Sequence, residues 1–99
     1  MNLNQVTLLG SLSCEPVFDE TPNGTPVCKF IVETKTKKRG EVTPTFHNIS
    51  VIGKSLCDVV ALHAKAGKNI LVRGTLEYWN DTKKGTRLVD VKAEYVEFA

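Results

Sequence analysis

One short helical pattern interrupts a chain whose other apolar residues alternate, and this single interruption limits the folds that the chain can adopt. The pattern covers residues 55–66, where Ser55 is a favourable N-cap and Asp58 fits a variant of the capping box. Gly67 stands at the expected C-terminal stop. Period-two alternation on both sides of one helix predicts an all-β chain with a single helix.

The alternating segments predict five strands. They cover residues 6–12, 28–35, 46–52, 70–79 and 88–93, whereas residues 13–21 are expected to be irregular. Gly10 and Gly74 lie inside the first and fourth strands, where a small barrel must bend sharply. The alternation changes phase in the last strand, which predicts a bulge near residues 93–95.

The order of these elements predicts an OB-fold, a five-stranded Greek-key barrel whose helix lies between strands 3 and 4. With 99 residues, we assign positions 1–99 to a single OB-fold domain. A β-sandwich is the main rival, but its seven or more strands would be hard to fit. The residues expected on the inner face of the fourth strand are Ile70, Val72, Gly74, Leu76 and Tyr78.

The charge distribution and the cysteine content indicate the class of binding partner and the cellular compartment of the protein. The net charge is only +2, but residues 29–39 form a basic block, a local footprint suited to a polyanion. The cysteines Cys14, Cys28 and Cys57 are widely spaced and fit reduced thiols in a cytosolic protein. The N-terminus resembles neither a signal peptide nor a transmembrane span. We therefore expect a cytoplasmic protein with no membrane partner.

Aromatic side chains are expected on the outer surface of two strands. Ile49 and Val51 form the better core face of the third strand. Phe46 and Ile52 then point outward, and so does Trp79 in the fourth strand. Exposed rings on a sheet suit stacking against the bases of single-stranded nucleic acid. The alternative is that a loop or a partner subunit covers them.

Basic residues in two hairpin connections can hold the phosphates of such a strand. The expected contacts are Lys35, Lys37, Lys38 and Arg39 in the first connection, Lys83, Lys84 and Arg87 in the second, and Lys54 and Arg73 elsewhere. Alone, the first group also fits a solvated hairpin tip. Beside outward-facing aromatic residues, nucleic-acid binding is the stronger interpretation.

A set of short motifs resembles the bacterial-type single-stranded DNA-binding proteins over nearly the whole chain. The matching segments are NQVTLLG at residues 4–10, Pro16, TPNGT at 21–25, Phe46-His47, Gly53-Lys54, Lys65-Ala66-Gly67, and Gly74-Thr75-Leu76 with Trp79. No single segment is specific to this family, but the whole set in this order and with this spacing is. The resemblance implies an OB-fold that assembles, usually as a homotetramer, and wraps single-stranded DNA.

Residue by residue, the resemblance implies a reduced stacking surface. Trp79 corresponds to a stacking tryptophan of the family. Phe46 stands where the family usually has tryptophan, and Ile52 where phenylalanine is common. The sequence stops at Ala99, before the acidic tail of the family, so we expect either that the tail was removed or that this is a tailless relative. These departures also resemble the PriB-type primosomal proteins, which are tailless dimers of similar fold.

An oligomer interface is expected around His47, Asn4 and Val6. His47 corresponds to a family histidine near the subunit interface. On physical grounds, the N-terminal strand with Asn4 and Val6 can pair with its own copy at a sheet edge. A homotetramer is the expected assembly, with a dimer as the alternative.

No catalytic or metal-binding constellation stands out. Gly53-Lys54-Ser55 matches only the end of a P-loop, and the cysteines, His47 and His63 lack ligand spacing. We therefore expect no enzyme activity, no cofactor and no metal. A thiol- or metal-dependent enzyme on the same barrel is the weakest of three hypotheses.

The leading hypothesis is sequence-non-specific single-stranded DNA binding in replication, recombination and repair. It places the protein at the nucleoid of a bacterium, or in a plasmid or phage. The alternative is a PriB-like primosomal adaptor that binds single-stranded DNA together with replication proteins.

Overall fold

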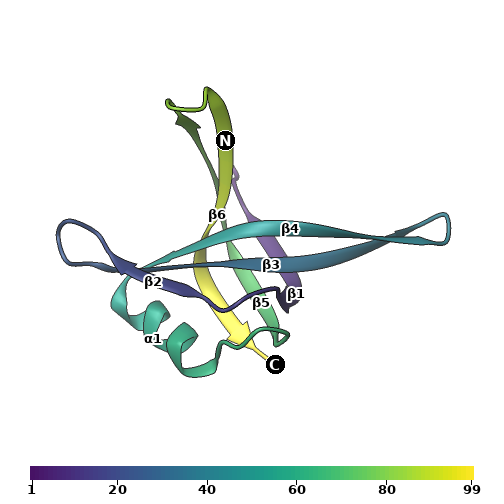
Figure 1. Ribbon diagram of the computed structural model, residues 1–99, viewed down its shortest axis with the longest axis horizontal. Helices are drawn as coiled ribbons and strands as arrows, with labels where there is room; N and C mark the ends of the chain where they lie inside the picture. Colours follow the sequence, from purple (N-terminus) through teal and green to yellow (C-terminus); the bar gives the residue numbers. More distant parts are fainter.

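A closed barrel of five long strands forms the body of the molecule, with one helix packed against one end (Figure 1). The computed structural model describes residues 1–99, except for the side chain of Asp81. The elements are β1 (Val6–Leu12), β2 (Val17–Glu20), β3 (Pro26–Lys38), β4 (Glu41–Ile52), α1 (Lys54–His63), β5 (Asn69–Asp81) and β6 (Thr86–Phe98).

The strand order explains how the barrel closes. The strands follow the order β1-β5-β6-β4-β3-β2, and an additional pairing of β1 with β3 joins the two sides. The pair β4–β6 is parallel, and the other pairs are antiparallel. The expected all-β barrel with one helix is confirmed.

The position of the helix differs from the sequence-based expectation. Residues Val17–Glu20 form the short strand β2, which pairs with β3 across a turn at residues 21–25. The helix therefore lies between the fourth and fifth strands, not between the third and fourth. All β2 side chains are exposed, so this strand lacks the alternation by which strands are recognised.

The barrel interior holds the apolar residues of every long strand and of the helix. The expected core face of β4 is confirmed, since Ile49 and Val51 are buried. Cys28 and Val32 of β3 are fully buried as well. The other buried apolar residues are Leu12, Phe30, Cys57, Val60, Ile70, Val72, Val91, Ala93 and Val96. Together they form one hydrophobic cluster, which holds the strands and the helix together.

Close strand crossings explain both interior glycines. A Cβ atom on Gly10 would collide with the carbonyl oxygen of Glu33, and one on Gly74 would collide with that of Lys92. Gly74 also marks the expected bulge: Arg73 pairs with Tyr95, whereas Gly74 pairs with Ala93. The extra residue on β6 is therefore Glu94, and the strands bend there.

Beyond these bends, two hairpins leave the barrel as arms. We call residues 33–46 the β3–β4 arm and residues 76–91 the β5–β6 arm (Figure 1). Leu76 and Tyr78, expected in the core, lie on the second arm and are 36% and 57% exposed. The expectation was wrong because alternation continues along an arm that no longer encloses a core.

The helix begins earlier than expected. Lys54 is its first residue, and the N-cap is Gly53 with φ of 111°, without a side-chain cap. The predicted Ser55 cap is therefore wrong, because the sharp exit from β4 needs the left-handed conformation that glycine adopts readily. No helix among the described residues is long and apolar enough to cross a membrane.

Candidate nucleic-acid interface

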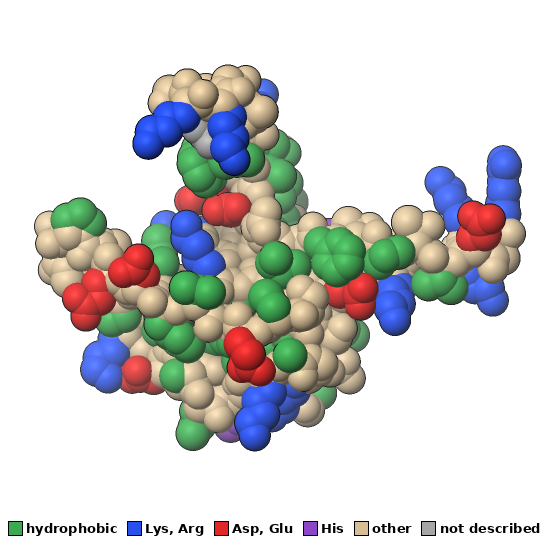
Figure 2. All heavy atoms as spheres, in the orientation of Figure 1, with side chains coloured by type: hydrophobic (Ala, Val, Ile, Leu, Met, Phe, Trp, Pro, Cys, Tyr) green, Lys and Arg blue, Asp and Glu red, His purple; other side chains and the backbone are tan. Residues whose placement is uncertain are grey.

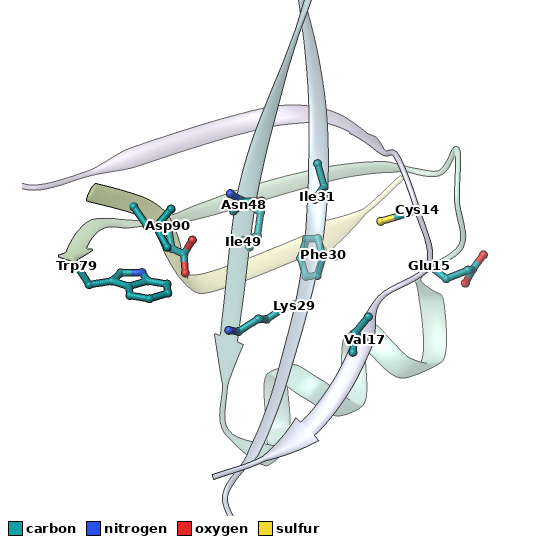
Figure 3. A pocket seen from close by; sticks show the side chains of 11 residues that line it. Cys14, Glu15, Val17, Lys29, Phe30, Ile31, Asn48, Ile49, Trp79 and Asp90 are labelled. Carbon is teal, nitrogen blue, oxygen red and sulfur yellow. The ribbon is translucent and has the colours of Figure 1, made fainter. Parts of the chain in front are cut away.

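Trp79 on the β5–β6 arm stands over the outer surface of β3 and β4 (Figure 3). Its side chain is 45% exposed and borders a hollow of about 320 Å³. The hollow is lined by Cys14, Glu15, Val17, Lys29, Phe30, Ile31, Asn48, Ile49, Leu88 and Asp90. The walls are mainly apolar, with polar groups at the rim, as in sites that hold a flat ring.

The other two predicted stacking residues line neighbouring hollows. Ile52, 44% exposed, shares a hollow of about 580 Å³ with Trp79. Phe46, 58% exposed, lines a smaller hollow with Asn48 and Asp90, both of which also line the first. The structure thus brings Trp79, Phe46 and Ile52 to one continuous outer surface.

The arms carry most of the predicted basic residues. Figure 2 shows Lys and Arg side chains gathered at the two arm tips, with apolar side chains on the surface between them. The exposed residues are Lys35, Lys37, Lys38 and Arg39 on the β3–β4 arm, and Lys83, Lys84 and Arg87 on the β5–β6 arm. The guanidinium carbon of Arg87 lies 5.0 Å from the centroid of the Tyr78 ring, a cation–π contact that orients it.

Two predicted basic residues lie apart from this surface. The guanidinium carbon of Arg73 is 4.8 Å from the centroid of Tyr95, on the barrel side of the bulge. It does not line the hollows beside Trp79. Lys54 is paired with Asp58 in the first turn of α1, with an Nζ–Oδ2 distance of 2.7 Å. The hydrogen bond and charge of Asp58 raise the pKa of Lys54.

The residues expected at an oligomer interface lie on two elements. His47 of β4 is half-buried, and its Nε2 lies 2.9 Å from Thr34 Oγ1. Asn4 hydrogen-bonds the backbone of β5, and Val6 begins β1. On the side away from β5, β1 pairs with β3 only at residues 11–12, which leaves an open backbone edge over residues 6–10.

Sequence reasoning missed two polar residues of the site. Lys29 and Asp90 both line the two hollows beside Trp79. The signal was present, because alternation places Lys29 outward between buried Cys28 and Phe30. Nothing in the sequence alone brings β6 next to that face of β3.

The thiols and histidines form no reactive centre in the part of the chain that the structure describes. Cys28 and Cys57 are buried, whereas Cys14 is exposed. Burial and the neighbouring Cys57 raise the pKa of Cys28 to about 12, which keeps it a neutral thiol. Among the described residues, no group of three His, Cys, Asp or Glu side chains could hold a metal ion.

Comparison with known proteins assigns the family. The sequence model of the single-strand binding protein family matches residues 3–99. The chain belongs to this family. Its members are non-enzymatic DNA-binding proteins, in agreement with the sequence-based expectation.

Curated family members are similar at a moderate level. The mitochondrial single-stranded DNA-binding protein 1-A of Xenopus laevis is 32% identical over 95 residues, which are 84% of this chain and 65% of that protein. The single-stranded DNA-binding protein of Deinococcus radiodurans is 32% identical over 103 residues, which are 96% of this chain and 34% of that protein. The chain thus spans less than two thirds of either relative.

A solved structure of a family member shares the fold. The Plasmodium falciparum protein described as an SSB complex with ssDNA superposes with a TM-score of 0.87 at 21% identity. The match covers 100% of this chain and 96% of that one. The OB-type barrel of the single-strand binding family is therefore the fold of this chain.

Proposed function

We propose that this protein binds single-stranded DNA of any sequence along the surface between its two arms. The observation that carries the proposal is Trp79, 45% exposed over a hollow on an outer sheet surface and held on one of two basic arms. The names of the relatives, which are single-stranded DNA-binding proteins, support the same function.

The mechanism combines stacking with charge neutralisation. Bases stack on Trp79 and Phe46, and such contacts contribute about 1–3 kcal/mol per base whatever the sequence. Ile52 offers a smaller apolar contact. The arm residues Lys35, Lys37, Lys38, Arg39, Lys83, Lys84 and Arg87 neutralise phosphates. If about five phosphates are neutralised per subunit, the logarithm of affinity falls with that of salt with a slope of about −3 to −4.

Self-association completes the proposed function. The open edge of β1 around Val6 pairs with its own copy, an arrangement that twofold symmetry favours. Asn4 precedes this edge, and His47 on β4 is the third residue proposed for the interface. A homotetramer is the proposed assembly, with a dimer as the alternative. Sedimentation at several protein concentrations measures the assembly, and a monomer at every concentration would exclude it.

Replication, recombination and repair are the proposed processes, because each exposes single-stranded DNA. Replication proteins are then the proposed further partners. A bacterial, plasmid or phage origin with a place at the nucleoid is proposed as well, and the similarity to a bacterial protein supports it.

Tryptophan fluorescence tests the central proposal. Trp79 is the only tryptophan, so a titration with oligo-dT that quenches its emission places DNA against this residue. The quenched complex is expected to weaken steeply with salt. No binding even at low salt would contradict the proposal.

A pair of variants separates stacking from general charge attraction. Trp79→Ala is expected to weaken binding of a labelled oligonucleotide at least about tenfold, since a stacked base is lost. Tyr95→Ala is the matched control, because Tyr95 is an exposed aromatic residue outside the hollows beside Trp79. A loss of less than about twofold in Trp79→Ala would instead favour the adaptor, in which phosphate contacts dominate.

A further inference from the structure

An acidic side chain lies at the centre of the proposed DNA surface. Asp90 of β6 lines the hollow beside Trp79, the hollow shared by Trp79 and Ile52, and the hollow beside Phe46. It therefore borders the hollows beside both aromatic residues. Figure 3 shows its carboxylate next to the Trp79 indole.

The strand register fixes this placement. Glu77 pairs with Asp90, and Trp79 pairs with Leu88, along the antiparallel β5–β6 ladder. Cross-strand partners share a face, and so do residues two apart. Asp90 and Trp79 therefore face the same side of the β5–β6 arm.

Asp90 forms no close ion pair, although Lys29 lines the same two hollows beside Trp79. Within the described part of the chain, its half-buried carboxylate forms no hydrogen bond or ion pair. Glu77 on the same face differs, because its Oε1 lies 3.9 Å from Lys92 Nζ. The carboxylate disfavours a DNA phosphate beside it, whereas Lys29 at the rim of the same hollows can hold one. A base edge is therefore the group that we expect to meet Asp90.

We propose that Asp90 gives this subsite a preference for bases that carry an exocyclic amino group. A carboxylate only accepts hydrogen bonds, and the 4-amino group of cytosine is a donor that Asp and Glu accept. The 4-keto oxygen of uracil or thymine is an acceptor at the same position and meets the carboxylate unfavourably. The proposal rests on the proposed DNA binding and adds a graded preference to it.

Asn48 strengthens the discrimination. It lines the hollows beside Trp79 and beside Phe46, together with Asp90. Its amide can donate to the ring nitrogen beside the cytosine amino group. A donor and an acceptor side by side match the cytosine edge, while Trp79 stacks on the face of the same base.

The cleanest test compares oligo-dC with oligo-dU at slightly alkaline pH. These polymers differ only at the 4-position and at N3, which accepts in cytosine and carries a proton in uracil, so stacking area and phosphate charge are matched. A hydrogen bond to a charged group predicts that oligo-dC binds at least about fivefold more tightly to the wild-type protein. Equal affinities would overturn the proposal without any variant being made.

A charge-matched pair of variants assigns the preference to Asp90. Asp90→Asn is expected to bring the ratio of the two affinities to about one, because an amide both donates and accepts. Glu94→Gln removes the same charge from an exposed position outside the three hollows and is expected to keep the wild-type ratio.

The outcomes are distinguishable from failure of the proposed function. If Asp90→Asn retains the wild-type ratio, another group sets the preference and the inference is wrong. If neither oligonucleotide binds at low salt, the proposed DNA binding itself is wrong, and the inference falls with it.

Discussion

The side chain of Asn4 pairs with the backbone of Leu76 as another strand residue would. Its Nδ2 donates to the Leu76 carbonyl oxygen at 2.9 Å, and its Oδ1 accepts from the Leu76 nitrogen at 2.9 Å. The β1–β5 ladder pairs Val6 with Gly74, so Asn4 stands opposite Leu76 in the same register. The contact holds the N-terminal residues against the base of the β5–β6 arm.

Replacing Asn4 tests this contact. Asn4→Asp keeps the acceptor but loses the donor and sets a carboxylate against the Leu76 carbonyl. We expect the free energy of unfolding to fall by about 1 kcal/mol, measured by urea denaturation. Asn2→Asp is the control, because Asn2 is exposed and precedes β1; equal stabilities of the two variants would show that the contact contributes nothing.

Neutralising the β3–β4 arm should change the salt dependence of DNA binding. With Lys35, Lys37 and Lys38 replaced by Gln, three phosphate contacts are lost and the slope should become shallower by about 2. The measurement is oligo-dT affinity at four or more salt concentrations.

Lys65→Gln with Lys68→Gln provides the control for the arm variant. These lysines follow α1, at the end of the barrel away from both arms (Figure 1). Their loss should leave the slope nearly unchanged. A similar slope change in both variants would mean that binding responds to net charge, not to the arms.

Gly74→Ala should destabilise the barrel strongly. The added Cβ would collide with the carbonyl oxygen of Lys92, so the β5–β6 pair must shift, at a cost of about 3 kcal/mol. Gly24→Ala separates this clash from backbone strain, because Gly24 has φ of 83° and open space around it. The melting temperature of Gly74→Ala should be well below that of Gly24→Ala. The reverse order would contradict the close crossing of β5 and β6 at Gly74.

The buried thiol of Cys28 predicts lower stability at high pH. Its pKa rises from 9.0 to about 12 in the folded protein, so between these values the unfolded chain binds fewer protons than the folded one. The free energy of unfolding should therefore fall as the pH rises through this range, by up to about 1.4 kcal/mol per pH unit.

The contribution of Cys28 is isolated by comparison with Cys28→Ala. Other groups also titrate at high pH, but they are common to both proteins. The fall in stability between pH 9 and 11 should be smaller in Cys28→Ala, as followed by urea denaturation. Identical pH dependence would show that the thiol does not contribute.

The sequence predicted the barrel wherever burial on one face imposes alternation. Ile49 and Val51 illustrate this, since both are buried as their positions in the pattern required. The strand Val17–Glu20 escaped notice because both of its faces are exposed. Leu76 was assigned to the core because its parity is correct, although the arm has by then left the barrel.

The same limit applies to the candidate site. Outward alternation was enough to identify Trp79 and Phe46, because an exposed ring on a strand is itself unusual. The position of Asp90 beside their hollows could not be predicted, because that requires the β4–β6 pairing, which is only two residue pairs long. Arg73 was expected to contact DNA, but it stacks on Tyr95, its partner across the β5–β6 ladder, and does not line the hollows beside Trp79.

The bulge at Gly74 and Glu94 divides the last two strands into parts that face different selective demands. The barrel half must fill a closed volume, so substitutions there are tightly limited. Beyond Val91, the last core residue on the other side of the bulge, the arm fills no such volume, and its length can change at small entropic cost. Relatives with longer, shorter or differently charged arms can therefore adapt how they hold DNA while the barrel remains unaltered, and the same freedom makes the arms the place to engineer binding.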